Sequence, residues 1–583
     1  MTHRKRNCLL LLAAMLISFQ TLIACSPVLP TNEPEPTYSP SAAVENNSLP
    51  TATPDPQPTN PPEATATPAP LKLYLSEPVP SGMLKDDVPI TYKRRYASDT
   101  TLWFGPAVDA PLGDVLSTAT WTYALAAPFP TILDDIASDD FQDLWFGQTN
   151  NPGISAKFLY VPVSIAPQLK RLWGNPDTAT VKIVESIPNP DTLWEQNAWA
   201  IIPFDELNPK LKVISIERKS PLFKDFQSMD YPLSFQYQLV QEPTLNPGYQ
   251  PEDIQRLIDG IESTNRDPEK MTTLIMTGVT ALVRATAYRM EINGITYPGE
   301  QIAHWLREAD ITHISNEVSF YEDCPFPDPH NRSLLFCSDP KYIELFDYVG
   351  ADIIELTGNH NNDMLYVHGE DVTDFNLDLY QQYNLKTYGG GRNLEDAMAP
   401  TILTHNGNRI AFIGCNAPGP EFAWAGEDQG GAAPCGDFQW MIDEISRLSK
   451  EGVLPIATLQ YYEDYYNFPE IHHIRDFNPL AQAGAAIVNG SQAHRPKGMA
   501  FEGDGFIDYG LGNLFFDQMG YTINGENLQQ TSWEVIQRHT IYDGQLLSTE
   551  LLTAKLFDYA QPRPMTKKER AVFISELFTA SGW

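Results

Sequence analysis

The sequence predicts a layered α/β fold for its larger, C-terminal part and a smaller α/β domain before it. From residue 271 onward, short apolar segments alternate with amphipathic segments of helix length. Several apolar segments end on polar side chains, as ELTG does at Asn359-His360, and layered α/β proteins carry their sites at such strand ends. The 583 residues exceed one ordinary domain, since domains average about 150 residues.

The first 24 residues predict an export signal. A basic start, RKR, precedes an apolar run from Cys8 to Phe19 that is too short to span a bilayer comfortably. The run is followed by LIAC, which resembles the bacterial lipobox, whose cysteine is acylated. We therefore expect Cys25 to anchor the chain to a lipid bilayer, on the cell surface or in the cell envelope. An ordinary secretory signal is the alternative.

Two further segments precede the larger domain. Residues 25–70 are rich in Pro, Thr and Ser and cannot bury enough apolar surface to fold, so they predict an extended tether. Residues 71–245 show short alternating strands and helices. Within them, WAIIPFDELNPKLKVISIERKSPL, followed by YPL, resembles the second lobe of type 2 periplasmic solute-binding proteins. This resemblance implies a solute-binding-like domain, and a plain accessory α/β domain is the alternative.

Residues 246–270 bring Pro and Gly before an amphipathic helix and predict a linker to the larger domain, 271–583. The predicted strands of that domain are 271–280, 311–318, 351–358, 453–460 and 486–493, with a hairpin over 401–416 that turns on Asn406-Gly407. The predicted helices are 298–309, 340–350, 371–384, 437–452 and 478–485.

The charge of the chain excludes one class of partner. The formal net charge is −35, and no stretch collects Lys and Arg into a basic patch. Phosphates would be repelled by such a chain, so nucleic acid is not expected as a partner.

The cysteines predict two disulfides. Of six cysteines, four remain when Cys8 and Cys25 are set aside, and an even number in an exported protein favours disulfides. Each close pair flanks a Pro- or Gly-rich loop, so we expect the pairs Cys324–Cys337 and Cys415–Cys435. Each bridge stabilises the fold by roughly 3 kcal/mol in the chain-entropy model. A four-cysteine zinc site is disfavoured because CxxC spacing is missing.

Polar residues at the predicted strand ends carry the candidate chemistry. They are Glu317, Asn359, His360, Gln460, Gln492 and His494. Asn, His and carboxylate side chains together are ligands of hydrolytic metals, which polarise a phosphoryl or carbonyl oxygen and lower the pKa of a bound water.

At this point the chain resembles a known family, the CapA (PgsA-like) capsule and poly-γ-glutamate biosynthesis proteins of the calcineurin-like metallophosphatase superfamily. The resemblance rests on ADITHISNE, ADIIELTGNHNND, YGGGRNLEDAMAP, AGAAIVNGSQAH and FIDYGLGNLFFDQ. It covers about residues 271–518. It implies a metallophosphatase-like α/β sandwich and a part in making, exporting or anchoring an anionic envelope polymer.

The resemblance also implies roles for single residues. Glu317 takes the acidic position of the family's NLE motif, and Asn359 that of a metal ligand. His360 takes the neighbouring position of an acid or phosphate contact, and Asp363 matches the family's following Asp. His494 matches the last His of a GHxH-like motif. Together these residues imply a metal-dependent phosphoesterase site.

Three departures from the family pattern weaken that site. Gly278-Val279 stands where the family has Gly-Asp, and Gln460 and Gln492 stand where it has His. In one interpretation the Gln460 and Gln492 amides join the ligands in an oxygen-rich site that favours Mn²⁺, Mg²⁺ or Ca²⁺ over Zn²⁺. In the other, which we favour, the site is degenerate, has no metal and binds an envelope polymer or its precursor without cleaving it.

Two other features predict ordinary structure. Adjacent side chains point apart on a helix or strand, so His472-His473 is predicted to be a surface pair rather than a ligand pair. The four tyrosines between 461 and 466 are expected to pack rather than to line a groove.

Overall fold

The computed structural model describes residues 71–76, 79–85, 90–93, 102–148, 150–243, 251–523 and 526–583. All of them lie within one compact unit. The predicted export signal, the lipidation site Cys25 and the tether over 25–70 lie outside the described residues. Within these described ranges, no helix has both the length and the apolar character needed to cross a bilayer.

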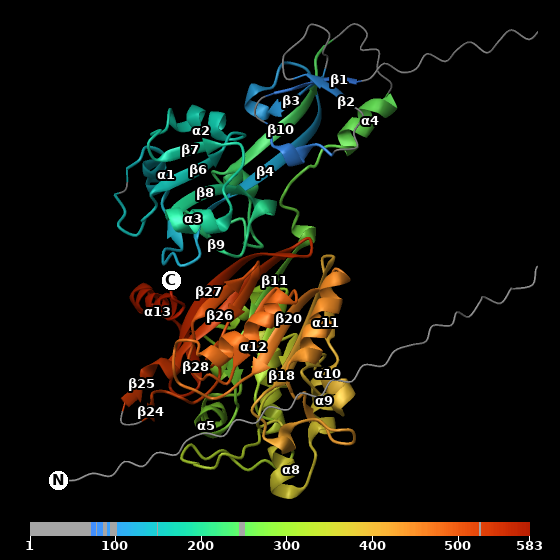
Figure 1. Ribbon diagram of the computed structural model, residues 1–583, viewed down its shortest axis with the longest axis vertical. Coiled ribbons are helices and arrows are strands. Elements are labelled where there is room, and N and C mark those ends of the chain that lie inside the picture. Colours follow the sequence, from blue (N-terminus) through green and yellow to red (C-terminus); the bar gives the residue numbers. More distant parts are fainter. Residues whose placement is uncertain are drawn as a thin grey trace, which may run out of the picture. The chain divides into compact units, whose positions relative to one another are not determined.

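The N-terminal part builds a ten-stranded mixed sheet (Figure 1). Its strands are β1 (Leu71–Leu75), β2 (Ile90–Lys93), β3 (Leu102–Pro106), β4 (Asp114–Pro128), β5 (Asp135–Ile136), β6 (Phe158–Pro162), β7 (Val181–Val184), β8 (Ala198–Pro203), β9 (Leu211–Ile216) and β10 (Ser234–Gln241). The main order is β2-β1-β3-β10-β4-β8-β6-β7, with β9 paired to β4 and β5. The helices here are α1 (Ser138–Trp145), α2 (Ala166–Trp173), α3 (Pro190–Gln196) and α4 (Pro251–Asp259).

Two large sheets form the C-terminal part (Figure 1). The eight-stranded sheet has the order β15-β14-β13-β11-β26-β27-β28, with β12 paired to β13. Its strands are β11 (Met271–Met276), β12 (Val279–Thr280), β13 (Ile311–Asn316), β14 (Ile353–Glu355), β15 (Lys386–Tyr388), β26 (Trp533–Tyr542), β27 (Gln545–Phe557) and β28 (Gln561–Pro564). The strands from β11 to β15 run parallel, and β26 joins them antiparallel.

The six-stranded sheet has the order β17-β18-β20-β21-β23-β22. Its strands are β17 (Thr401–His405), β18 (Asn408–Asn416), β20 (Leu454–Gln460), β21 (Ile487–Ser491), β22 (Met499–Glu502) and β23 (Gly505–Asp508). Two small antiparallel pairs are β16 (Gly390–Gly391) with β19 (Gly431–Ala432), and β24 (Tyr521–Ile523) with β25 (Glu526–Leu528).

Helices of the C-terminal part are α5 (Arg284–Asn293), α6 (Ala303–Glu308), α7 (Glu344–Val349), α8 (Asp363–His368), α9 (Thr373–Gln382), α10 (Leu394–Met398), α11 (Gln439–Lys450), α12 (Ile471–Gln482) and α13 (Lys567–Ala580). The predicted strands and helices between residues 271 and 493 are present, although α12 begins earlier than the predicted segment 478–485. The hairpin turns on Asn406 and Gly407, whose φ angles of 47° and 78° suit a tight hairpin.

Alternation of side chains along the strands shows how the layers stack. Leu274 and Met276 of β11 pack in one core cluster with Phe412 of β18 and Ile456 of β20, so the two sheets face each other. The intervening Ile275 packs in a second cluster, against α5, α6 and α7. On the second sheet, Ile413 and Ala457 pack against α11 and α12. The order helix, sheet, sheet, helix confirms the predicted layered α/β fold.

Candidate functional site

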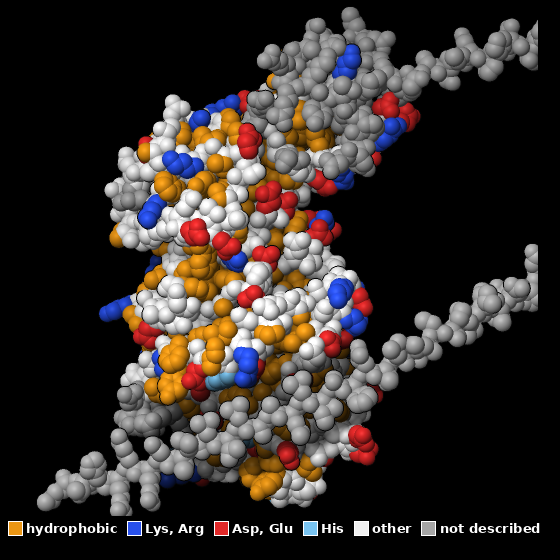
Figure 2. Space-filling model, viewed as in Figure 1, with side chains coloured by type: hydrophobic (Ala, Val, Ile, Leu, Met, Phe, Trp, Pro, Cys, Tyr) orange, Lys and Arg blue, Asp and Glu red, His pale blue; other side chains and the backbone are white. Residues whose placement is uncertain are grey.

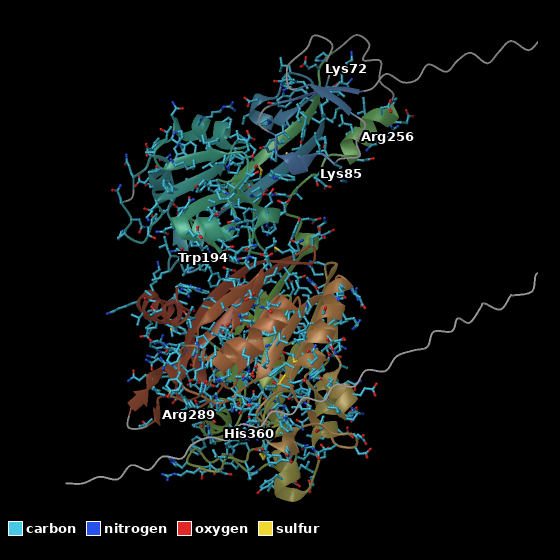
Figure 3. The ribbon with its side chains drawn as sticks, in the orientation of Figure 1. Lys72, Lys85, Trp194, Arg256, Arg289 and His360 are labelled. Atoms are coloured by element: carbon cyan, nitrogen blue, oxygen red, sulfur yellow. A yellow bond between two sulfur atoms is a disulfide. The ribbon has the colours of Figure 1, made fainter. Side chains whose placement is uncertain are left out.

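The first group of predicted site residues follows two parallel strands of the eight-stranded sheet. Glu317 comes directly after β13, and Asn359 and His360 come shortly after β14. The backbones of Val318 and His360 form a bridge between the two segments. At Gly358 a Cβ atom would lie 2.4 Å from the Glu317 carbonyl oxygen, so this close approach requires glycine. Figure 3 marks His360 in the C-terminal part.

The second group lies at the ends of β20 and β21 in the six-stranded sheet. Gln460 ends β20 and pairs with Ser491, which ends β21. Gln492 and His494 follow with φ angles of 75° and 47°, in the left-handed region. Non-glycine residues rarely adopt this region, and such backbone strain concentrates at functional sites.

A hydrogen-bonded amide cluster joins the two groups. Gln460 Nε2 donates to Asn359 Oδ1 at 3.0 Å and also to Gln492 Oε1. Gln460 Oε1 accepts from Ser491 Oγ at 2.8 Å. The three amide oxygens predicted as cation ligands therefore already accept hydrogen bonds. Among the described residues, Asn359 Nδ2 and Gln492 Nε2 have no acceptor, so two amide donors remain for a ligand.

His360 lies between two carboxylates. Its Nδ1 is 2.8 Å from Asp363 Oδ2, and its Nε2 is 3.7 Å from Glu317 Oε1. Burial lowers the pKa of His360, but the hydrogen bond to Asp363 and the charge of Glu317 outweigh burial and raise this pKa above its ordinary value. The buried Glu317 Oε2 and Asp363 Oδ1 have no hydrogen-bond partner within the described ranges.

The disulfide loop over 324–337 covers His360. Cys324 and Cys337 are bonded, and so are Cys415 and Cys435, which confirms both predicted pairs. In this loop Phe336 donates its backbone N–H to Asp363 Oδ2 at 2.7 Å, and its ring centroid lies 4.7 Å from that of His360. The bridge therefore helps to fix a wall of the site.

Among the described residues, His494 has a hydrogen-bond partner at only one of its two ring nitrogens. Its Nδ1 is 2.8 Å from Asn513 Oδ1, an acceptor, so Nδ1 carries the proton and Nε2 is left with its lone pair. Asn513 also donates to the His494 carbonyl oxygen at 3.3 Å. Sequence reasoning missed Asn513 as a partner, although FIDYGLGNLFFDQ contains it, because only folding brings residues 494 and 513 together.

The position of the missing aspartate is filled by apolar side chains. Val279 is fully buried and packs in a cluster with Ala281, Val283, Val318, Phe336 and Phe516. A two-metal centre needs metals about 3.5–4 Å apart, with charged ligands around both. An apolar cluster at this end of the strands supplies no ligand. The residues present do not fit a two-metal centre, although the free oxygens of Glu317 and Asp363 suit a single positive group.

One group of potential ligands was missed by the sequence reasoning. Asp464, Glu470, His472 and His473 each offer one ligand atom, and these atoms lie within 4.8 Å of one another. The prediction of a surface pair is wrong for His473, which is 1% exposed, and the two imidazole centroids are 4.3 Å apart. Burial and the charge of Lys497 lower the pKa of His473 to about 3. The clustering of acids and histidines between 463 and 473 was the available signal.

Comparison with known proteins finds similarity to capsule synthesis proteins. Residues 273–518 match the family described as bacterial capsule synthesis protein PGA_cap. The capsule biosynthesis protein CapA of Bacillus anthracis is 23% identical over 263 residues, which are 44% of this chain and 62% of that protein. The chain thus spans less than two thirds of this capsule protein's length. The matched segment contains the predicted strand-end residues from Glu317 to His494.

The similarity of this chain to solved structures is weaker than its similarity to the capsule synthesis proteins. A 5'-nucleotidase precursor from Thermus thermophilus has a TM-score of 0.28 at 14% identity, over 53% of this chain and 59% of that chain. A putative phosphate ABC transporter substrate-binding protein from Clostridium perfringens has a TM-score of 0.23 at 12% identity, over 27% and 72%. TM-scores of this size establish neither a shared fold nor a shared activity.

Proposed function

We propose that this chain is a cell-envelope protein that takes part in capsule or poly-γ-glutamate synthesis, export or anchoring. The match of residues 273–518 to the capsule synthesis family and the similarity to CapA support this role. The protein is held at a lipid bilayer through acylated Cys25, as the LIAC motif implies. Its partner is an envelope polymer or the precursor of one.

The residues at or after the ends of β13, β14, β20 and β21 form what we call the strand-end site: Glu317, Asn359, His360, Asp363, Gln460, Gln492 and His494. In this proposal the strand-end site binds its ligand without cleaving it. The observation that carries this is the amide cluster, because the oxygens of Asn359, Gln460 and Gln492 are engaged in hydrogen bonds with Gln460 or Ser491. The remaining amide N–H groups suit the carboxylate or hydroxyl oxygens of a polymer. His360, whose pKa is raised, adds positive charge for an anionic group.

The negative net charge of the chain opposes the binding of an anionic polymer outside the strand-end site. The net charge is −35, and on the face shown in Figure 2 basic side chains lie among acidic ones without forming a continuous patch. An anionic polymer is therefore recognised at a local site, and cations that bridge polymer and protein strengthen its binding. The same net charge disfavours nucleic acid as a partner.

An active metal-dependent phosphoesterase is the second candidate. Free Glu317 Oε2, free Asp363 Oδ1 and the unprotonated Nε2 of His494 favour it, because these atoms suit a cation. Mn²⁺, Mg²⁺ or Ca²⁺ is the expected ion, since oxygen donors predominate. The side-chain oxygens of Gln460 and Gln492 would have to give up their present hydrogen bonds before they could bind the metal.

Equilibrium binding of poly-γ-glutamate and of a capsular polysaccharide to the full chain tests the proposal. Asn359→Ala removes one free donor and should weaken binding roughly ten- to 150-fold, since a hydrogen bond to a charged group contributes about 1.5–3 kcal/mol net. Gln382→Ala, an exposed amide of α9, is the matched control and should bind as the parent does. Equal binding by both variants, or no binding of either polymer, refutes the assignment. If a chelator leaves polymer binding unchanged, cations do not bridge the polymer and the protein.

A further inference from the structure

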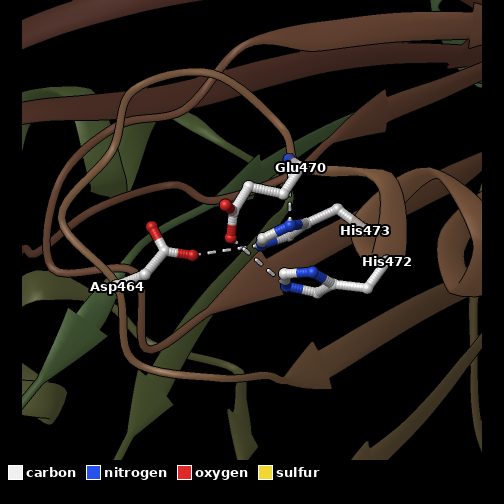
Figure 4. Close-up of side chains that lie close together, drawn as sticks. All are labelled: Asp464, Glu470, His472 and His473. Atoms are coloured by element: carbon white, nitrogen blue, oxygen red, sulfur yellow. Dashed lines mark hydrogen bonds and ion pairs between the residues drawn. The ribbon is translucent and has the colours of Figure 1, made fainter. Parts of the chain in front are cut away.

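A second cluster of chemically active side chains lies beyond the strand-end site, on the segment that follows Gln460 (Figure 4). Asp464 comes from the loop after β20, Glu470 from the N-cap of α12, and His472 and His473 from its first turn. Figure 4 shows the four side chains turned toward one another. Their ligand atoms lie within 4.8 Å of each other, and a metal ion bridging such atoms would draw them to ligand distance.

One buried polar atom in this cluster, Asp464 Oδ2, lacks a hydrogen-bond partner among the described residues. His473 is 1% exposed, and the described part of the chain offers its Nε2 only Asp464 Oδ2, at 3.5 Å. That Oδ2 is buried and makes no hydrogen bond with the described residues. An unsatisfied buried polar atom is costly, so Asp464 Oδ2, which faces the buried His473 ring, indicates a missing partner.

The surroundings orient these atoms as the second shell of a metal site does. Lys497, fully buried, donates to Asp464 Oδ1 and to the Tyr466 carbonyl oxygen, which leaves Oδ2 directed at His473. His472 Nε2 lies 3.9 Å from Glu470 Oε2. Two carboxylates against one ammonium leave a local charge of about −1, which favours an added cation.

From these contacts we propose that Asp464, Glu470, His472 and His473 bind one divalent transition-metal ion of the zinc class. Two imidazoles and two carboxylates are a complete tetrahedral set for Zn²⁺, whereas Mg²⁺ and Ca²⁺ prefer oxygen ligands alone. Four protein ligands leave no open position, so this is a structural site.

Binding requires one tautomer change, and the protons balance. His473 Nδ1 accepts the backbone N–H of Glu470 at 3.2 Å, so the ring proton of the metal-free protein is on Nε2. The metal takes the lone pair at Nε2, and the proton moves to Nδ1. No proton is released, and the Glu470 N–H loses its hydrogen bond of 3.2 Å to this ring.

The ion would tie the 461–470 segment to α12, beside the strand-end site. Tyr465 in this segment stacks on His494, with ring centroids 6.2 Å apart. Arg495 donates to the Tyr465 carbonyl oxygen at 3.1 Å. A fixed loop therefore holds an aromatic wall against His494. This inference does not rest on the proposed function, because ordering of the loop can be measured without any polymer.

Titration of the metal-stripped full chain with Zn²⁺ and with Co²⁺ tests the site. We expect one Zn²⁺ per chain bound at this site, and a Co²⁺ complex with the intense visible absorption of tetrahedral coordination. His472→Asn and Glu470→Gln should each raise the Kd for Zn²⁺ at least about tenfold, as loss of metal-site residues does. Both side chains are partly exposed, and circular dichroism confirms that the variants fold. Hydrogen exchange over 461–470 should slow with Zn²⁺.

Two control variants separate this site from others. His330→Asn, an exposed histidine in the 324–337 loop, should bind Zn²⁺ as the parent does. Asn359→Ala, at the strand-end site, should also leave the Co²⁺ spectrum unchanged. The proposal is overturned if the parent binds no Zn²⁺, if His472→Asn and Glu470→Gln bind it unchanged, or if Asn359→Ala abolishes the tetrahedral signal. None of these results bears on polymer binding, which is measured separately.

Discussion

Replacing one buried acid should remove a large part of the pH dependence of stability. Asp508, at the end of β23, is 1% exposed, and burial raises its pKa from 3.8 to about 7 despite hydrogen bonds from Gly510 and Gln537. The folded protein therefore holds a proton between about pH 4 and pH 7 that the unfolded chain has already lost. In that window the free energy of unfolding falls as pH rises.

The magnitude follows from the difference between the two pKa values of Asp508, 3.8 and about 7. Each pKa unit corresponds to about 1.4 kcal/mol, so full ionisation of this carboxyl costs the fold about 4 kcal/mol. Asp508→Asn cannot ionise. Relative to the parent, this variant should gain about 4 kcal/mol of stability between pH 4 and pH 8. Changed hydrogen bonds at Gln537 add only a constant offset.

Urea unfolding of both proteins at half-unit pH steps measures this difference. Asp504→Asn, in an exposed turn four residues earlier, corrects for the loss of one negative charge from a chain of net charge −35. If the difference between Asp508→Asn and the parent stays flat from pH 4 to pH 8 after this correction, the Asp508 carboxyl does not carry the pH dependence assigned to it.

Three further variants test parts of the fold by urea unfolding. Glu534→Met should raise the free energy of unfolding by about 1–3 kcal/mol, because both oxygens of this buried carboxyl lack partners among the described residues; a loss instead would mean that the carboxyl has a partner. The double substitution Cys415→Ala and Cys435→Ala should cost about 3 kcal/mol for a bridge spanning 20 residues, and the parent in reducing agent, which breaks both bridges, should lose about twice as much. Gln460→Met should cost about 2–4 kcal/mol, since three side-chain hydrogen bonds are lost; a cost near zero would argue against the amide cluster.

The sequence predicted those features that depend on local pattern. Short apolar segments indicated the strands, and Asn406-Gly407 indicated the hairpin turn, because both signals lie within a few residues. The polar strand ends indicated Glu317 and Gln460 as neighbours in one region. The disulfide pairs followed from short spacing.

Pairings between distant segments could not be predicted. The contact of His494 with Asn513 and the hydrogen bond from the Gln460 side-chain amide to Gln492 depend on how strands align in three dimensions. His473 was assigned to the surface because adjacent helical positions diverge, yet α12 packs its first turn against buried Tyr461 and fixes this ring inward. Tertiary packing, and not the local sequence pattern, determines that the His473 side chain is buried.

Whether the strand-end site is catalytic is decided by assaying hydrolysis of a phosphodiester and of a phosphomonoester by the full chain, with Mn²⁺ or Mg²⁺ supplied. We expect no turnover above that of Asn359→Ala, while polymer binding still depends on Asn359. Metal-dependent turnover by the parent that disappears in Asn359→Ala would contradict a non-catalytic strand-end site and would establish the phosphoesterase instead.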